Sequence, residues 1–144
     1  MLTDVFAAKP EALPRYRDAG FPDPREFGFP TVRARGLDPV ALAILDAMLS
    51  RASLEEALES ATMTPAEAPD LYRAPVVTTL STRTVRMLPA VSADRLIWLA
   101  EDWTSHDELS GLGAESARDW LKEVQGLCRR TVSEQSLLFV WNCL

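Results

Sequence analysis

The residues most able to do chemistry gather in the stretch SADRLIWLAEDWTSHDEL, at positions 92 to 109. This stretch holds the chain's only histidine, His106, among several carboxylates, so a shared metal ion or triad chemistry would have to use this imidazole. Carboxylates adjacent in sequence are weak support for either, because transition-metal sites usually need more nitrogen or sulfur ligands. We therefore interpret His106 as part of a solvated helical first turn capped by Ser105 and Glu108, and we expect no metal site.

The other reactive groups follow no known catalytic pattern. The sequence contains no glycine-rich phosphate loop, no G-x-S-x-G motif and no H-E-x-x-H motif. Its two cysteines, Cys128 and Cys143, fall at no metal-ligand spacing and lie among apolar residues, which favours buried free thiols. These observations favour a protein that is not an enzyme and needs no cofactor, and they leave an enzyme as the alternative.

The helical periodicity of this stretch separates its two tryptophans. Ser92 is a suitable N-cap, and the i, i+3, i+4, i+7 pattern that starts at Leu96 places Trp103 on the core face. At about 100° per residue, Trp98 lies about 200° from Leu96, among charged side chains. A tryptophan on a polar face is either covered by another part of the domain or anchors an interface.

The composition predicts one globular domain over residues 1–144. The chain is 47% hydrophobic and 25% charged, and its net charge of −6 argues against binding nucleic acid over a broad surface. No apolar run approaches the roughly 20 residues of a membrane-spanning helix. The N-terminus, MLTDVFAAKPEALPR, lacks the basic start of a secretory signal, so we expect a cytoplasmic protein without membrane contact.

Residues 9–37 predict a proline-rich arm. The segment holds five prolines and three glycines, so we expect an irregular path with no ordinary helix or central strand. Four aromatic rings, those of Tyr16, Phe21, Phe27 and Phe29, are suited to pin the arm to the core. The alternative is that the rings contact a partner.

Start signals predict helices along much of the remaining chain. Four residues are suited to cap a helix, because each precedes an apolar helical pattern or a proline. They are Asp38, Ser53, Thr64 and Ser116. The stretch PVVTTLSTRTVRMLP, from residue 75 to 89, is rich in β-branched residues and is predicted to be extended, either as one bent strand or as a hairpin about Ser81.

The C-terminal stretch SLLFVWNCL is apolar on both faces of a strand, which is typical of a buried strand. We therefore predict an α+β fold that is mainly α-helical, with about five helices packed on a small sheet. That sheet would contain segment 75-88 and the C-terminal strand 136-143.

The order of these elements and the phrases DVFAA, FPTVRARGLDPVALAILDAML and WTSHDEL resemble small bacterial proteins of uncharacterised function. The resemblance implies a bacterial, cytoplasmic, single-domain protein, and it implies no activity and no functional residues.

Two functional hypotheses follow. The first is a non-enzymatic protein-interaction module that forms a homo-oligomer or binds an immunity-like or regulatory protein partner. Its interface candidates are Trp98, Phe21 and Phe29. The second is a pocket under the proline-rich arm that binds a small anionic molecule or acts as an enzyme. Its anion-binding candidates are Arg33, Arg35 and Arg83.

Overall fold

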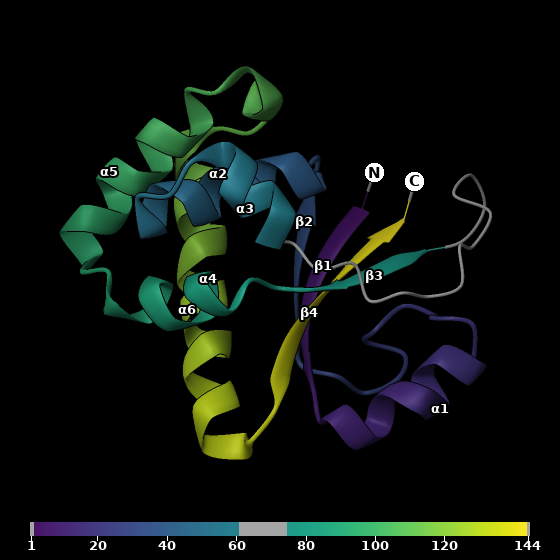
Figure 1. The fold of residues 1–144 in the computed structure, drawn as a ribbon. Helices are drawn as coiled ribbons and strands as arrows, with labels where there is room; N and C mark the ends of the chain where they lie inside the picture. Colours follow the sequence, from purple (N-terminus) through teal and green to yellow (C-terminus); the bar gives the residue numbers. More distant parts are fainter. Residues whose placement is uncertain (1, 61–74, 144) are drawn as a thin grey trace.

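Four strands form one antiparallel sheet in this computed structural model, which describes residues 2–60 and 75–143. The strands are β1 (Leu2–Ala8), β2 (Thr31–Arg35), β3 (Val76–Thr79) and β4 (Leu137–Cys143), in the order β2-β1-β4-β3. The strands nearest the two ends of the chain therefore pair at the centre of the sheet, with Val5 opposite Val140 (Figure 1). β4 is apolar and mostly buried, which confirms the predicted C-terminal strand.

Six α-helices lie in the described part of the chain, so the α+β and mainly helical fold class is confirmed. They are α1 (Leu13–Asp18), α2 (Pro39–Ser50), α3 (Leu54–Ser60), α4 (Thr82–Met87), α5 (Ala93–Thr104) and α6 (Ala114–Glu134). Short 3-10 turns occur at Pro10–Ala12, Leu88–Ala90 and Asp107–Leu109. Within the described residues, no helix combines the length and the apolar character that crossing a membrane requires.

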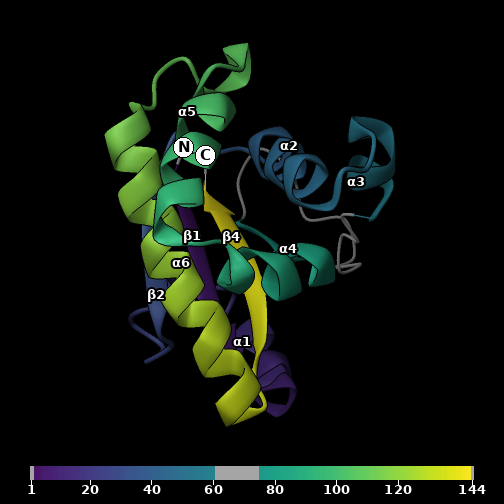
Figure 2. The ribbon, with the colours of Figure 1, turned by 90° about the vertical axis from the view of Figure 1, so that its left-hand side faces the viewer.

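The alternation of side chains along the strands builds two separate cores. On one face of the sheet, Val5 and Val140 pack with residues of α2, α5 and α6. On the other face, Phe6, Phe139 and Trp141 pack with α1 and the aromatic rings of the arm. Figure 2 shows α4 and α6 on the near side of β4 and α1 behind it. The sheet is therefore covered on both faces, which explains why β4 has no polar side.

Local capping explains where several helices begin. Asp38 accepts a hydrogen bond from the backbone of Ala41, and Ser53 forms a reciprocal capping box with Glu56. Both N-termini agree with the sequence prediction. The start predicted at Ser116 is wrong, because α6 begins at Ala114 with Gly113 as its N-cap. The start signal at Thr64 lies outside the described residues.

The arm differs from the irregular path expected for it. The six-residue helix α1 contains Pro14, which lies in its first turn, where a proline is tolerated. The segment after Pro30 is free of proline and forms β2. β2 is an edge strand, a position where fewer backbone donors need partners. The arm thus adds an edge strand to the sheet as well as covering one face.

Segment 75–88 is extended only in part. β3 ends at Thr79, and the chain turns at Ser81 into α4, so neither the single bent strand nor the hairpin forms. The Ser81 hydroxyl accepts a hydrogen bond from the backbone of Arg83 and donates one to buried Asp46 on α2. Thr84 donates a second hydrogen bond to Asp46. These contacts with α2 outweigh the preference of β-branched residues for strands.

Candidate functional site

The two tryptophans of α5 differ as the helical angles predict. Trp103 is fully buried, and its indole nitrogen donates a hydrogen bond of 2.9 Å to the backbone oxygen of Ala41. Trp98 remains 72% exposed, so nothing in residues 2–60 and 75–143 covers it. The fold therefore explains Trp103 completely and leaves Trp98 without a packing role.

His106 lies exposed at the start of the 3-10 turn Asp107–Leu109, so its solvated position is confirmed. The predicted capping box with Ser105 and Glu108 does not form, because the Ser105 hydroxyl donates to the backbone oxygen of Asp102 instead. In residues 2–60 and 75–143, no group of three or more histidine, cysteine, aspartate or glutamate side chains could hold a metal ion. The two cysteines form no disulfide with each other; Cys128 is buried as predicted, whereas Cys143 is only partly buried. Burial raises the pKa of the Cys128 thiol to about 11.

The three candidate anion-binding arginines do not form one site. The guanidinium of Arg33 binds both oxygens of Asp4, at 2.8 and 2.7 Å, and reaches Asp23 on the arm at 2.8 Å. Arg83 binds Asp46 at 2.9 Å and belongs to α4, which follows β3 at the opposite edge of the sheet from β2. Arg35 is exposed at the end of β2. Asp4 and Asp23 compensate the charge of Arg33, and Asp46 compensates that of Arg83.

The aromatic rings of the arm pack on the sheet rather than forming a free surface. Phe21, Phe27 and Phe29 are partly buried, and each lies with its ring centroid 5.1 to 5.3 Å from that of Tyr16. The backbone oxygen of Phe21 also accepts a hydrogen bond of 2.9 Å from the indole of Trp141. The rings therefore anchor the arm, which was the first of the two alternatives.

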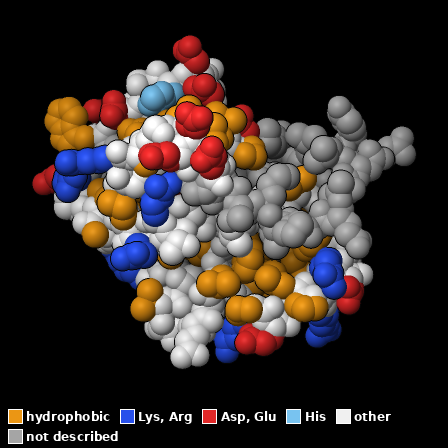
Figure 3. Space-filling view, viewed as in Figure 1, with side chains coloured by type: hydrophobic (Ala, Val, Ile, Leu, Met, Phe, Trp, Pro, Cys, Tyr) orange, Lys and Arg blue, Asp and Glu red, His pale blue; other side chains and the backbone are white. Residues whose placement is uncertain are grey.

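A groove that sequence reasoning missed lies between α2, α4 and α5. Its volume is about 310 Å³. The lining residues are Met48, Leu49, Arg51, Arg86, Met87, Ala90, Val91, Arg95 and Leu99, and we call this surface the arginine groove. Figure 3 shows basic side chains beside hydrophobic ones on the side of the molecule below α5. No sequence signal links these residues, because the three helices are brought together only by the fold.

The arginines of this groove differ from Arg33 and Arg83 in their pairing. Within the described part of the chain, Arg51, Arg86 and Arg95 form no ion pair. All three are exposed. Trp98 follows Arg95 by three residues on α5, a spacing that makes the two side chains neighbours on the helix surface. Trp98 does not line the arginine groove, but it is therefore adjacent to the groove on the surface of α5.

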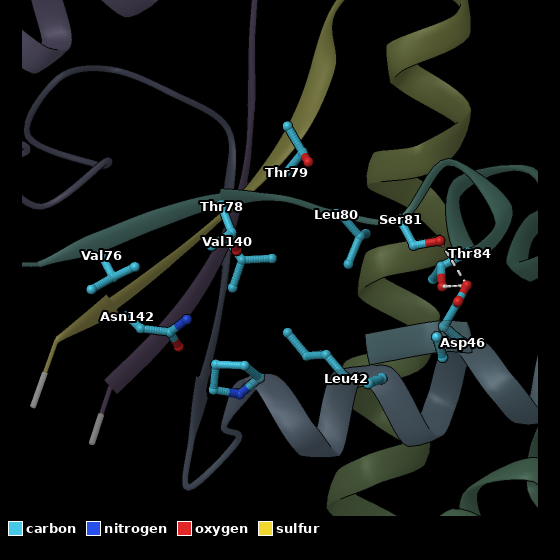
Figure 4. Close-up of a pocket in the computed structure, with 13 residues that line it drawn as sticks. Leu42, Asp46, Val76, Thr78, Thr79, Leu80, Ser81, Thr84, Val140 and Asn142 are labelled. Atoms are coloured by element: carbon cyan, nitrogen blue, oxygen red, sulfur yellow. Dashed lines mark hydrogen bonds between the residues drawn. The ribbon is translucent and has the colours of Figure 1, made fainter. Parts of the chain in front are cut away.

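A second cavity lies between α2 and the face of the sheet formed by β3 and β4 (Figure 4). Its volume is about 110 Å³, and we call it the α2 pocket. Most of its wall is apolar, with side chains from Pro39, Leu42, Ala43, Ala57, Val76, Leu80 and Val140. The polar residues that line it are Asp46, Thr78, Thr79, Ser81, Thr84 and Asn142, although the side chain of Thr79 points away from it (Figure 4). The pocket does not lie under the proline-rich arm, where the second hypothesis placed it.

No family model matches this chain, and neither a curated protein nor a solved structure matches it. The two sites must therefore be judged on their own chemistry. The arginine groove offers positive charge that forms no ion pair within the described residues, beside an exposed tryptophan, and the α2 pocket offers a small, mostly apolar space. The first is suited to a macromolecular partner and the second to a small molecule.

Proposed function

We propose that this protein is a non-enzymatic interaction module that binds an acidic, amphipathic helical segment of a partner protein. The segment would lie in the arginine groove and contact Trp98. The observation that carries the proposal is the exposure of Trp98, 72%, directly beside a groove with three arginines that form no ion pair in the described part of the chain. Tryptophan and arginine are the residues most enriched among those that dominate binding energy at interfaces.

The charge of the groove supports an acidic partner. The whole chain has a net charge of −6, yet Arg51, Arg86 and Arg95 surround this one depression. Complementary charge speeds association and discriminates among partners, so carboxylates on the partner would pair with these guanidinium groups. A nucleic acid is a poorer fit, because the acidic remainder of the surface would repel a long polyanion.

The floor of the groove supports a helical partner. Met48, Met87 and Leu99 give an apolar surface between three helices, a form of groove that accepts the apolar face of an amphipathic helix. Methionine is flexible and polarizable and adapts to the shape of a partner side chain. Met87 is 40% exposed and Trp98 more so, and a bound helix would bury both side chains.

A synthetic helical peptide tests the proposal directly. The peptide would be about 15 residues long, with leucine at i, i+3, i+4 and i+7 and glutamate on the other face. We expect binding in the micromolar range by fluorescence anisotropy, weakening as salt is raised. Trp98→Ala should reduce the affinity about 30-fold, the loss expected for an interface anchor worth about 2 kcal/mol.

Matched controls distinguish binding in the groove from nonspecific binding elsewhere on the surface. Val132→Ala removes another exposed hydrophobic side chain, on α6, and should leave the affinity unchanged. Replacing Arg51, Arg86 and Arg95 by glutamine should remove most of the salt dependence. Equal binding of a peptide with lysine in place of glutamate would overturn the proposal. So would sedimentation showing that Trp98 instead holds two copies of this chain together, because the groove partner would then be the protein itself.

A further inference from the structure

We propose that the partner segment carries a phosphorylated serine or threonine, whose phosphate group binds the guanidinium groups of the arginine groove. The inference rests on the proposed function and adds one requirement to it, a phosphate group at one position of the helical segment. Phosphorylation of the partner would then control its binding to this protein.

The groove concentrates positive charge. Three of its nine lining residues are arginines, and no aspartate or glutamate is among them. The carboxylates of the neighbouring helices lie elsewhere, since Asp46 of α2 is buried at the α2 pocket and neither Asp94 nor Glu101 of α5 lines the groove. Arg129 on α6 adds a further positive charge nearby, because its guanidinium donates a hydrogen bond of 3.3 Å to the backbone oxygen of Pro89. Within the residues that the structure describes, this charge is left for an incoming anion to compensate.

The turn between α4 and α5, which joins Arg86 to Arg95, is held in place by α6. The side-chain amide of Gln125 donates hydrogen bonds of 2.9 Å to the backbone oxygens of Leu88 and Val91 in this turn. The backbone at the two arginines is therefore fixed before a ligand binds, and only their side chains need to be ordered. A site that is organised in advance loses less free energy on binding.

A phosphate group matches several guanidinium groups better than a carboxylate does. Within this chain, the single guanidinium of Arg33 already binds both oxygens of Asp4, at 2.8 and 2.7 Å. A phosphate on serine or threonine carries a charge of about −1.5 to −2 at pH 7 and has three strong acceptor oxygens, so it can bind more than one arginine. On the proposed helical partner, leucines fill the face that enters the groove, so one side chain with a larger charge is favoured over several glutamates.

Three versions of the synthetic helical peptide test the inference. They differ at one position bordering the leucine face, which holds phosphoserine, glutamate or serine, and each bordering position is tested in turn. We expect the best phosphoserine peptide to bind about tenfold more tightly than the matching glutamate peptide, by fluorescence anisotropy. Lowering the pH from about 7.5 to about 5.5 should reduce this advantage, because the phosphate takes up a proton near pH 6. Glutamate and the three guanidinium groups that line the groove stay ionised over that range.

A double variant assigns the phosphate to the groove. With Arg86→Gln and Arg95→Gln combined, the phosphoserine and glutamate peptides should bind within about twofold of each other, because the guanidinium groups that distinguish them are removed. Both arginines are exposed, so the variant should fold normally. The matched control is Arg130→Gln on α6, where the arginine pairs with Glu134 at 3.2 Å and does not line the groove. This control should keep the tenfold difference.

The results separate this inference from the proposed function. A glutamate peptide that binds through Trp98, with no gain from phosphoserine at any position, would overturn the inference and leave the proposed function standing. Free O-phosphoserine that binds as tightly as the phosphoserine peptide would also overturn the inference, because the groove would then take a small phosphorylated molecule. If none of the three peptides bound, the proposed function would fail together with the inference.

Discussion

At the scale of single residues, replacing each of the two tryptophans of α5 by alanine should have very different effects on stability. Trp103→Ala should lower the free energy of unfolding by about 3 to 5 kcal/mol, because it empties a fully buried site and leaves the backbone oxygen of Ala41 without its donor. Trp98→Ala should change that free energy by less than about 0.5 kcal/mol, because the ring is 72% exposed. Urea unfolding of both variants measures the difference. A large loss in Trp98→Ala would show that the ring is buried in solution.

The tryptophans and the arginines show which features of the site can be predicted from the sequence. The positions of Trp98 and Trp103 follow from the helical period alone, since both lie on one helix. The pairing of Arg33 with Asp4 does not, because 29 residues separate them and only the register of β1 with β2 brings them together. The arginines of the groove are likewise far apart in the sequence, and only the packing of the helices brings them together. No local pattern could therefore have identified that surface.

Asn142 illustrates a different limit. A polar residue inside an apolar strand can be recognised from the sequence, and it marks a position that packing alone does not require. Its hydrogen-bond partner is Thr3, near the other end of the chain, and only the pairing of β1 with β4 brings the two residues opposite each other. The polar residue is visible in the sequence, and its partner is not.

At the scale of elements, the aromatic rings should make the arm a stabilising part of the fold. Phe29 stacks on Phe6 with a centroid distance of 5.3 Å and meets the ring of Tyr16 at 5.2 Å. Phe29→Ala should therefore lower the free energy of unfolding by about 2 to 3 kcal/mol, less than for a fully buried ring. Chemical unfolding measures this loss, with Val132→Ala as an exposed control of small effect. An effect as small as that of the control would mean that the arm is detached in solution.

Elements whose signals are local were predicted well, and those that depend on distant partners were not. The amphipathic pattern of α5 and the apolar pattern of β4 lie within each element, and both were found. α4 contains Thr82, Thr84 and Val85, which favour strands when considered alone. Its helix is fixed by hydrogen bonds to Asp46, more than 30 residues earlier, so tertiary contacts override the local preference.

At the scale of the whole molecule, one ion-pair network joins the arm to the sheet. Arg33 on β2 binds Asp4 on β1 and Asp23 on the arm, while Arg25 binds Asp23 at 3.0 Å. The hydrogen bond from Arg25, together with that from Arg33, holds the pKa of the Asp23 carboxyl well below its usual range. The folded arm therefore keeps Asp23 ionised at pH values where the unfolded chain takes up a proton.

This difference predicts a loss of stability in acid. Asp23 has the lower pKa in the folded state, so its contribution is fully present above the unfolded value of about 3.9 and declines as the pH falls below it. Unfolding by urea at pH 6 and at about pH 3 should show the decline, and Asp23→Asn should reduce its slope. At pH 6 the same substitution should cost on the order of 1 kcal/mol, because Asp23 is partly exposed and solvent screens the pair.

The control for this prediction is Asp119→Asn, on α6, where the carboxylate is 59% exposed and lies 3.3 Å from Arg118. An exposed pair of that kind contributes little, so the variant should follow the unmodified protein at both pH values. If Asp23→Asn also followed it, the carboxylate of Asp23 would have the same pKa in the folded and unfolded chains. The ion pairs of Asp23 would then contribute nothing to holding the arm, and the loss of stability in acid would have to arise elsewhere in the molecule.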